Sequence, residues 1–264
     1  MDLQLKDKTA LVTGSTGGIG LAIAEALARE GAAVIVNGRS QTRVNEAINR
    51  IRNETSSSHL KGIAADLSTD SGLQQLAREA SDVDILVNNL GIYEAKPFDQ
   101  ITDDDWRHIL EVNLMSGVRL SRHYLPKMRQ RNWGRVVFIS SESGVQIPVE
   151  MIHYGVTKTA QIALARGLAE TTVGSGITVN SVLAGPTRSE GVESFVGGLA
   201  RGRGVSEKQV EQEFFQNVRP TSLLKRFASP AEVASLVAYI CSPVASAING
   251  AALRADGGVV RAIL

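Results

Sequence analysis

The sequence predicts an α/β fold in which a doubly wound parallel sheet of about seven strands carries helices on both faces. Short segments rich in β-branched residues alternate with longer segments of helical periodicity. The apolar cores of the short segments are nearly continuous, as in strands that are buried on both faces. In chain order these segments are KTALVTG, AAVIVNG, KGIAADL, VDILVNN, GRVVFISS, GITVNSVL and AALRADGG.

Between the expected strands, apolar residues recur at helical spacing, which predicts helices in these segments. Residues 21–29 show this spacing, residues 44–51 carry a polar outer face, and residues 162–168 are small and apolar. The TSSSH stretch at 55–59 is expected to form the turn between the second helix and the third strand. The alternation of strand and helix indicates right-handed crossovers. A chain of this length can bury one large core, so we expect a single domain over residues 1–264.

The segment at about 188–226 does not follow this alternation. It has glycines early and an amphipathic pattern later. Connections of this length between strands are usually functional, so we expect a lid or a substrate-binding loop. The arginines at 201 and 203 alternate with glycines and precede acidic residues, which favours a solvated turn over a basic patch for nucleic acid.

Charge, cysteine content and hydropathy exclude several classes of function. The net charge of +1 predicts neither nucleic acid nor a membrane as a partner. Cys241 is the only cysteine, which excludes an internal disulfide and a cysteine-based metal site, and we expect no bound metal. The N-terminal segment carries charges where a signal peptide is apolar, and no stretch reaches the roughly 18 apolar residues of a membrane helix. We therefore expect a soluble, cytoplasmic protein.

A glycine-rich turn, TGSTGGIG at 13–20, follows the first expected strand and opens the first helix. Gly14, Gly18 and Gly20 give the pattern G-x-x-x-G-x-G. Backbone amides and a helix N-terminus can approach a pyrophosphate at such a turn. Tight strand-to-helix turns need glycine even without a ligand, but the position after the first strand favours a dinucleotide site.

The end of the second expected strand, VIVNGRS, bears on which dinucleotide fits. An acid here commonly binds the ribose 2′-hydroxyl of NAD, whereas an arginine accommodates the 2′-phosphate of NADP. The sequence has Gly38 followed by Arg39, so charge matching favours NADP over NAD. Ser40 and Asn37 can add hydrogen bonds.

Tyr154 and Lys158 lie four residues apart in HYGVTKTA, so on a helix their side chains share one face. Taken alone, this is an ordinary helix pair. A free phenol has a pKa of about 10, and a nearby ammonium or an oxidised nicotinamide favours phenolate and lowers that pKa. Only together with the motifs that surround it does the pair predict proton transfer. His153 does not share the face of Tyr154, so we expect a packing or pocket-edge role for it.

Several motifs in this order resemble the short-chain dehydrogenase/reductase family. They are TGSTGGIG at 13–20, NNLG at 88–91, Asn113 in EVNLMSG, ISSESG at 139–144 and YGVTK at 154–158. The resemblance extends from the first strand to DGG at 256–258. It implies a Rossmann-type domain, a nicotinamide cofactor and a catalytic set of Ser, Tyr, Lys and Asn.

The resemblance implies catalytic roles for Asn113, Ser141, Tyr154 and Lys158. Tyr154 would be the general acid or base, and Lys158 would also hydrogen-bond the nicotinamide ribose. Ser141 would hold and polarise the substrate carbonyl, while Ser140 alternates away from it along the strand. Asn113 would support a water that links Lys158 to solvent, or would stabilise a local helix distortion. Glu142 directly follows Ser141 and can reach either substrate or solvent.

The family pattern also implies cofactor contacts, with two departures. Leu90 occupies the position at which the family motif usually has alanine. In the loop after the sixth strand, Pro186 lies two positions from the usual proline of the family's Pro-Gly pair, and Ser189 or Thr187 supplies the hydroxyl of the family's threonine. The residues implied in cofactor binding are Gly14, Ser15, Thr16, Gly18, Ile19, Gly20, Arg39, Ser40, Asp66, Leu67, Asn88, Gly91, Tyr154, Lys158, Gly185, Thr187 and Ser189.

Together these features predict an NADP(H)-preferring, ketoreductase-like enzyme that interconverts a ketone and a secondary alcohol. The alternatives are an alcohol dehydrogenase that works mainly in the oxidative direction, and a non-catalytic dinucleotide-binding sensor or structural protein. The complete catalytic set argues against the latter. The resemblance implies a homo-oligomer, either a tetramer or a dimer. Apolar residues of the segment 188–226 mildly favour an apolar ketone, although packing within the domain explains them equally well: Val192, Phe195, Val196, Leu199, Phe214 and Phe215.

Overall fold

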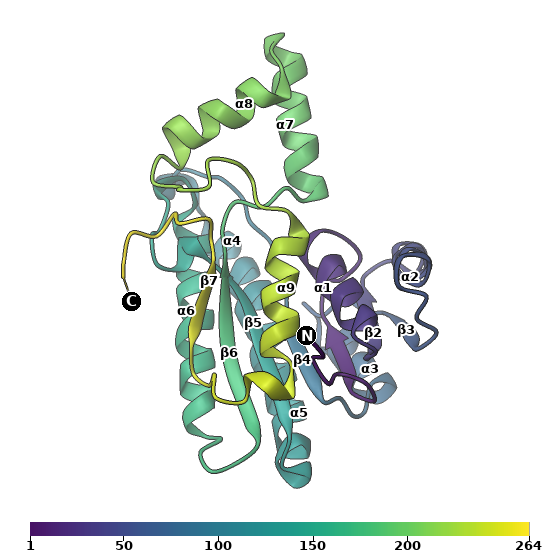
Figure 1. Cartoon of the computed structure of the whole chain (residues 1–264). Helices are drawn as coiled ribbons and strands as arrows, with labels where there is room; N and C mark the ends of the chain where they lie inside the picture. Colours follow the sequence, from purple (N-terminus) through teal and green to yellow (C-terminus); the bar gives the residue numbers. More distant parts are fainter. Residues whose placement is uncertain (264) are drawn as a thin grey trace.

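Seven parallel strands form one sheet in the order β3-β2-β1-β4-β5-β6-β7 (Figure 1). The computed structural model describes residues 1–263. Each segment predicted as a strand overlaps one, which confirms the predicted fold class. The strands are β1 (Thr9–Val12), β2 (Ala33–Gly38), β3 (Leu60–Ala64), β4 (Ile85–Asn88), β5 (Gly134–Ser141), β6 (Ile177–Ala184) and β7 (Ala252–Ala255).

Helices cover both faces of the sheet, and each face has its own apolar core. Successive residues of β1 point to opposite faces, so Val12 packs with residues of α1, α2 and α9, while Leu11 packs with residues of α3, α5 and α6. The helices are α1 (Gly18–Arg29), α2 (Gln41–Thr55), α3 (Asp70–Glu79), α4 (Asp103–Leu110), α5 (Ser116–Arg131), α6 (Ile152–Glu170), α7 (Glu190–Arg203), α8 (Glu207–Glu213) and α9 (Pro230–Ile240).

The order of the strands reverses beside β1. This strand pairs with β2 on one side and with β4 on the other, and chain connections from the two sides lead in opposite directions. In an open parallel sheet, such a switch leaves a crevice beyond the carboxyl ends of the strands, where ligands bind. The glycine-rich turn that was predicted from the sequence leaves β1 at this place.

The segment 188–226 forms two helices, α7 and α8, and a π-helical turn at Phe214–Val218. Figure 1 shows α7 and α8 standing beyond the sheet, on the side to which β6 leads. Ser189 and Ser206 begin the two helices by accepting hydrogen bonds from backbone amides of the first turns. No helix within residues 1–263 is long and apolar enough to cross a membrane.

The apolar residues of this segment pack mostly with one another. Val196, Val210, Phe215 and Phe227 are buried in a cluster of their own, and Val192 and Phe214 pack against it. Their packing supports the alternative that these residues stabilise the segment, whereas Phe195 and Leu199 are exposed.

We predict that Phe215→Ala will destabilise the segment by about 3–5 kcal/mol, because a buried phenylalanine at the centre of the cluster leaves a cavity when truncated. Phe195→Ala is the matched control: the Phe195 side chain is 61% exposed, and its loss should change stability by no more than about 0.5 kcal/mol. Urea unfolding and the rate of proteolysis within residues 188–226 measure both effects. Equal susceptibility of the two variants would contradict the assignment of a separate cluster.

Candidate active site

A cleft of about 220 Å³ lies at the carboxyl ends of β1, β2 and β3. It is lined by residues from the glycine-rich turn, the ends of β2 and β3, and the loop after β4. Gly14, Thr16, Arg39, Ser40, Asp66 and Leu67, all predicted to contact a cofactor, line it together with Asn37, Gly38, Arg43, Ala65 and Leu90.

The glycine-rich turn is held in a shape that only glycine adopts freely. Gly14 and Gly18 have φ angles of 60° and 56°, in the left-handed region. A Cβ at Gly20 would lie 2.4 Å from Asn89 Nδ2 and 2.6 Å from Gly14 O, so α1 begins in close contact with the end of β1. The hydroxyl of Ser15 donates to Val12 O at 2.7 Å and accepts from Asn37 N at 3.0 Å, which fixes the turn from inside.

The two asparagines of NNLG point in different directions. Asn89 Nδ2 donates to Thr13 O at 2.9 Å and to Gly14 O at 3.0 Å, so Asn89 supports the turn. Asn88 is buried and its Nδ2 lies 3.5 Å from Ser121 Oγ of α5, away from the cleft. Sequence reasoning chose Asn88 for the cofactor and missed Asn89, although both belong to the same motif.

Two arginines border the cleft where only one was expected. Arg39 follows β2 and Arg43 lies in the first turn of α2, which begins after Ser40. Arg43 Nη2 also lies 3.3 Å from Glu190 Oε2 at the start of α7, in an exposed ion pair. The pKa of the Asp66 carboxyl is lowered mainly by the hydrogen bond from the Ser68 hydroxyl, with a smaller contribution from Arg39.

The predicted catalytic side chains meet where β5 ends and α6 begins. Ser141 is the last residue of β5, and Tyr154 and Lys158 lie one turn apart on α6. Lys158 Nζ is 5.5 Å from the centre of the Tyr154 ring. Ser140 Oγ donates to Lys158 O at 2.8 Å, so the hydroxyl of Ser140 is bound to the backbone of α6.

Asn113 lies in a π-helical turn, η2 (Glu111–Met115), that interrupts the helix between α4 and α5. Its Oδ1 accepts from Ile92 N at 2.8 Å and its Nδ2 donates to Ile92 O at 2.9 Å. Asn113 Nδ2 also donates to Thr157 Oγ1 at 3.0 Å on α6. Asn113 therefore sits at a helix distortion, one of the two roles expected for it, and ties the loop after β4 to the catalytic helix.

Gln161 joins Asn113 to Lys158, and sequence reasoning missed it. Lys158 Nζ donates to Gln161 Oε1 at 3.1 Å, and Gln161 Nε2 donates to Asn113 O at 2.5 Å. Lys158 Nζ also donates to Ile139 O at 2.8 Å. The signal was present, because a residue three positions after Lys158 shares its helix face.

The protein's own groups shift the two pKa values in the directions expected from burial. Burial raises the pKa of Tyr154 to about 12, partly opposed by the hydroxyl of Ser141. Burial also lowers the pKa of Lys158 to about 7. Burial of the two side chains therefore dominates both pKa values in the absence of the cofactor, and a lowering of the Tyr154 pKa by Lys158 and an oxidised nicotinamide stays a prediction.

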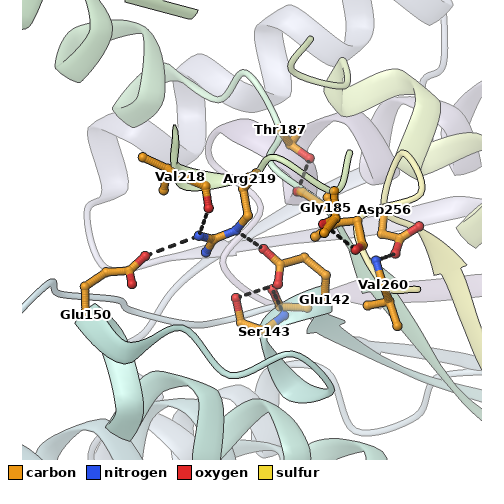
Figure 2. A network of polar contacts seen from close by, with 12 residues as sticks. Glu142, Ser143, Glu150, Gly185, Thr187, Val218, Arg219, Asp256 and Val260 are labelled. Carbon is orange, nitrogen blue, oxygen red and sulfur yellow. Dashed lines mark hydrogen bonds and ion pairs between the residues drawn. The ribbon is translucent and has the colours of Figure 1, made fainter. Parts of the chain in front are cut away.

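The loop after β6 is fixed against the loop after β7. A Cβ at Gly185 would lie 2.5 Å from Asp256 O, so these backbones meet where Gly185 leaves β6. Thr187 Oγ1 donates to Gly185 O at 2.9 Å, and Asp256 accepts from Val260 N at 3.0 Å (Figure 2). A Cβ at Gly18 would meet Ser189 Cβ at 3.3 Å, so the loop crosses over the glycine-rich turn.

A second cavity, of about 260 Å³, lies beside Tyr93, whose ring centre is 6.2 Å from that of Tyr154. His153 is buried at its edge, with its ring edge-on to Trp106, which confirms the expected packing and pocket-edge role. No cluster of three or more residues that could hold a metal ion occurs within residues 1–263. Cys241 is buried, and burial raises the pKa of its thiol to about 12, as expected of an apolar filler.

A family model described as short chain dehydrogenase matches residues 8–197, a range that includes the cleft, Ser141, Tyr154 and Lys158. The chain belongs to the short-chain dehydrogenase family. It is therefore an oxidoreductase of this family, whose members act on CH–OH and carbonyl groups with a nicotinamide dinucleotide.

Relatives of this short-chain dehydrogenase match over its whole length. An uncharacterised oxidoreductase of Bacillus subtilis, YvaG, is 48% identical, and all of both chains is covered. The 3-oxoacyl-[acyl-carrier-protein] reductase FabG of Aquifex aeolicus is 33% identical over 98% of this chain and 100% of the relative. The crystal structure of L-sorbose reductase from Gluconobacter frateurii, complexed with NADPH and L-sorbose, is 30% identical, with a TM-score of 0.94 and complete coverage of both chains.

The cleft of this short-chain dehydrogenase fits the nicotinamide dinucleotide that its family uses. Gly17 and Gly18 lie at the N-terminus of α1, where free backbone amides favour phosphate. Asp66 lies at the end of the cleft formed by β3, and Arg39 and Arg43 supply positive charge beside β2. A Cβ at Gly91 would come within 3.5 Å of both Asn113 Oδ1 and Lys158 Nζ, so the glycine keeps the approach to Lys158 open.

We predict that Gln161→Glu will move the alkaline limb of the pH profile of kcat/KM upward. A carboxylate beside Lys158 favours the ammonium form and raises the lysine pKa from about 7, so the charged form persists to higher pH. Gln161→Leu removes the acceptor and should move the same limb downward. Thermal unfolding of both variants serves as the control for folding, and an unchanged limb in both would show that this contact does not tune Lys158.

Proposed function

We propose that this short-chain dehydrogenase is an NADP(H)-preferring oxidoreductase that interconverts a ketone and a secondary alcohol, with Tyr154 as general acid or base. The observation that carries the proposal is the meeting of Ser141, Tyr154 and Lys158 at one end of the sheet, beside a cleft bordered by two arginines. Curated relatives named as reductases, and the NADPH complex of the L-sorbose reductase, support it.

The substrate oxygen is handled by the side chains at the end of β5 and the start of α6. Ser141 donates its hydroxyl proton toward the carbonyl oxygen and so polarises the carbonyl. Tyr154 donates its proton to that oxygen as the alcohol forms. Lys158 orients the cofactor ribose and returns a proton to the phenolate. When bound, the nicotinamide supplies or accepts the hydride at the carbonyl carbon.

The oxidative alternative uses the same side chains in reverse, with the Tyr154 phenolate accepting the proton. Burial raises the pKa of Tyr154 to about 12, so without cofactor the phenol carries the proton that reduction requires. A bound oxidised nicotinamide is positively charged and favours the phenolate, so the cofactor ratio sets the direction of the reaction. The sensor or structural alternative leaves the buried lysine and the phenol without a purpose, since binding alone requires neither.

The proposed cofactor contacts follow the positions of the residues. The turn from Gly14 to Gly20 holds the pyrophosphate, and Asp66 with Leu67 borders the adenine. Lys158 and Tyr154 face the nicotinamide ribose. The loop of Gly185, Thr187 and Ser189 covers the nicotinamide. The segment 188–226 is proposed as the lid over substrate.

We further propose a cytoplasmic homo-oligomer, a tetramer or a dimer, on the basis of family resemblance. Sedimentation velocity tests the assembly over a range of protein concentrations. A monomer at every concentration would remove the proposal.

Arg39→Ala and Arg43→Ala should each weaken NADPH binding about 10- to 100-fold while leaving NADH binding nearly unchanged, because charge-assisted hydrogen bonds to the 2′-phosphate contribute about 1.5–3 kcal/mol. Isothermal titration calorimetry with both cofactors measures the effect. Arg50→Ala is the matched control, since Arg50 lies on the same helix two turns away and pairs with Glu25. Equal loss for NADH and NADPH would contradict the NADP assignment.

Tyr154→Phe should reduce kcat by about 10²–10⁴-fold, the usual contribution of a general acid, while leaving NADPH binding largely intact. The assay follows NADPH consumption with a panel of ketones, β-ketoesters, acyl thioesters and sugars. Tyr239→Phe makes the same chemical change in α9 and should have wild-type turnover. Retained turnover in the Tyr154 variant would remove Tyr154 from the mechanism.

A further inference from the structure

Arg219 is held between the carboxylates of Glu142 and Glu150 (Figure 2). Its Nε donates to Glu142 Oε1 at 2.9 Å, and Glu142 directly follows Ser141. Its Nη1 donates to Glu150 Oε1 at 3.2 Å and to Val218 O at 3.0 Å. Glu142 comes from the end of β5, Glu150 from the loop before α6, and Arg219 from the end of the segment 188–226, so three parts of the active site converge on one guanidinium.

This ion pair is buried. The side chains of Arg219 and Glu142 are 9% and 4% exposed, whereas Glu150 is 40% exposed. Burying a charged pair costs desolvation energy that its attraction often fails to recover, and apolar side chains of similar size are frequently as stabilising. Stability alone therefore gives no strong reason for these two residues at this place.

The pair acts on the reacting groups as well as on the fold. Glu142 raises the pKa of Tyr154 and Arg219 lowers it, although both effects are smaller than that of burial. Glu142 also directly follows Ser141, the last residue of β5, so the pair lies next to a proposed catalytic residue along the chain. The buried charges thus lie beside Ser141, whereas the buried apolar residues of α7 and α8 pack in a cluster of their own.

The cluster has hydrogen-bonding capacity beyond its internal contacts. Arginine has five N–H donors, and the two on Nη2 of Arg219 have no partner within residues 1–263. Glu150 uses Oε1 toward Arg219, and its exposed carboxylate retains a second acceptor. A free donor and a free acceptor in one cluster suit hydroxyl groups, each of which both donates and accepts.

We propose that Glu142, Glu150 and Arg219 form the recognition site for substrate hydroxyl groups, and that the substrate is a neutral polyhydroxylated ketone. This inference rests on the proposed function and names its substrate class. Two carboxylates against one guanidinium leave the cluster with net negative charge, which disfavours a keto acid. An apolar ketone would leave the free donors and acceptors desolvated without partners, which is the basis of strong discrimination by polar sites.

The experiment compares three ketones of equal carbon count with NADPH: L-sorbose, 5-keto-D-gluconate and 2-hexanone. The wild-type enzyme should have the highest kcat/KM for L-sorbose. In the double variant Glu142→Met/Arg219→Met, the ratio of kcat/KM for L-sorbose to that for 2-hexanone should fall at least about 10-fold, mainly through KM. Because only a ratio between proteins is compared, the small open-chain fraction of the sugar cancels.

The control double variant is Arg226→Met/Glu232→Met. It makes the same replacement in an exposed ion pair that lies a few residues after Arg219 in the sequence. It should keep the wild-type ratio. NADPH affinity and the thermal midpoint show whether each variant is folded. If the double methionine variant does not fold, the single variants Glu142→Gln and Arg219→Lys replace it. Both keep a side chain of similar size; the first removes the negative charge, and the second removes the planar guanidinium.

The outcomes separate the two proposals. An unchanged ratio in the Glu142 and Arg219 variants would overturn the recognition role and leave the pair as a structural clamp. Wild-type preference for 2-hexanone or for the keto acid would overturn the substrate class, while reduction of either would support the proposed function. No turnover of any ketone, nor of the corresponding alcohols with NADP, would overturn the proposed function and the inference with it.

Discussion

Helix α1 begins so close to the ends of β1 and β4 that a side chain at position 20 would overlap Asn89 and the backbone of Gly14. This contact sets the height of the α1 N-terminus above the sheet, and with it the depth of the cofactor cleft. Asn89 uses the same closeness to bind the carbonyls of Thr13 and Gly14. The amides at the start of α1 thereby remain directed toward the cleft, and the turn cannot collapse onto β4.

A second set of contacts carries this fixed geometry to the catalytic groups. The loop after β4 is bound at Ile92 by Asn113, and Asn113 reaches α6 through Thr157 and Gln161. The position of Lys158 is therefore set by the same strand that supports the glycine-rich turn. The π-helical turn at Glu111–Met115 makes this possible, because an added residue in the helix turns the Asn113 side chain inward.

The sequence predicted the architecture well because burial of the sheet on both faces requires apolar residues along each strand, and this pattern is visible in the sequence. Nearly continuous apolar segments predicted every strand, and the motifs predicted Ser141, Tyr154 and Lys158. The sequence did not predict features that depend on the direction of a side chain or on contact between residues far apart in the chain. Asn88 and Asn89 are adjacent in sequence, and only the pleat of β4 separates the one that faces α5 from the one that reaches the turn. Arg219 lies far along the chain from Glu142, and no local pattern announces their meeting.

The segment 188–226 is bound to the site at both ends, by two ion pairs of different character. At its start, Glu190 meets Arg43 beside the cofactor cleft in an exposed pair, and such pairs contribute about 0–1 kcal/mol. Near its end, Arg219 is buried with Glu142 beside Ser141. Removing one partner of a buried pair leaves an uncompensated charge, so the second contact is much harder to break than the first.

Displacement of α7 from the cofactor side thus costs less than displacement of the chain at Arg219. Arg219 can therefore stay paired with Glu142 while the start of the segment moves, since Arg219 belongs to the firmly held end.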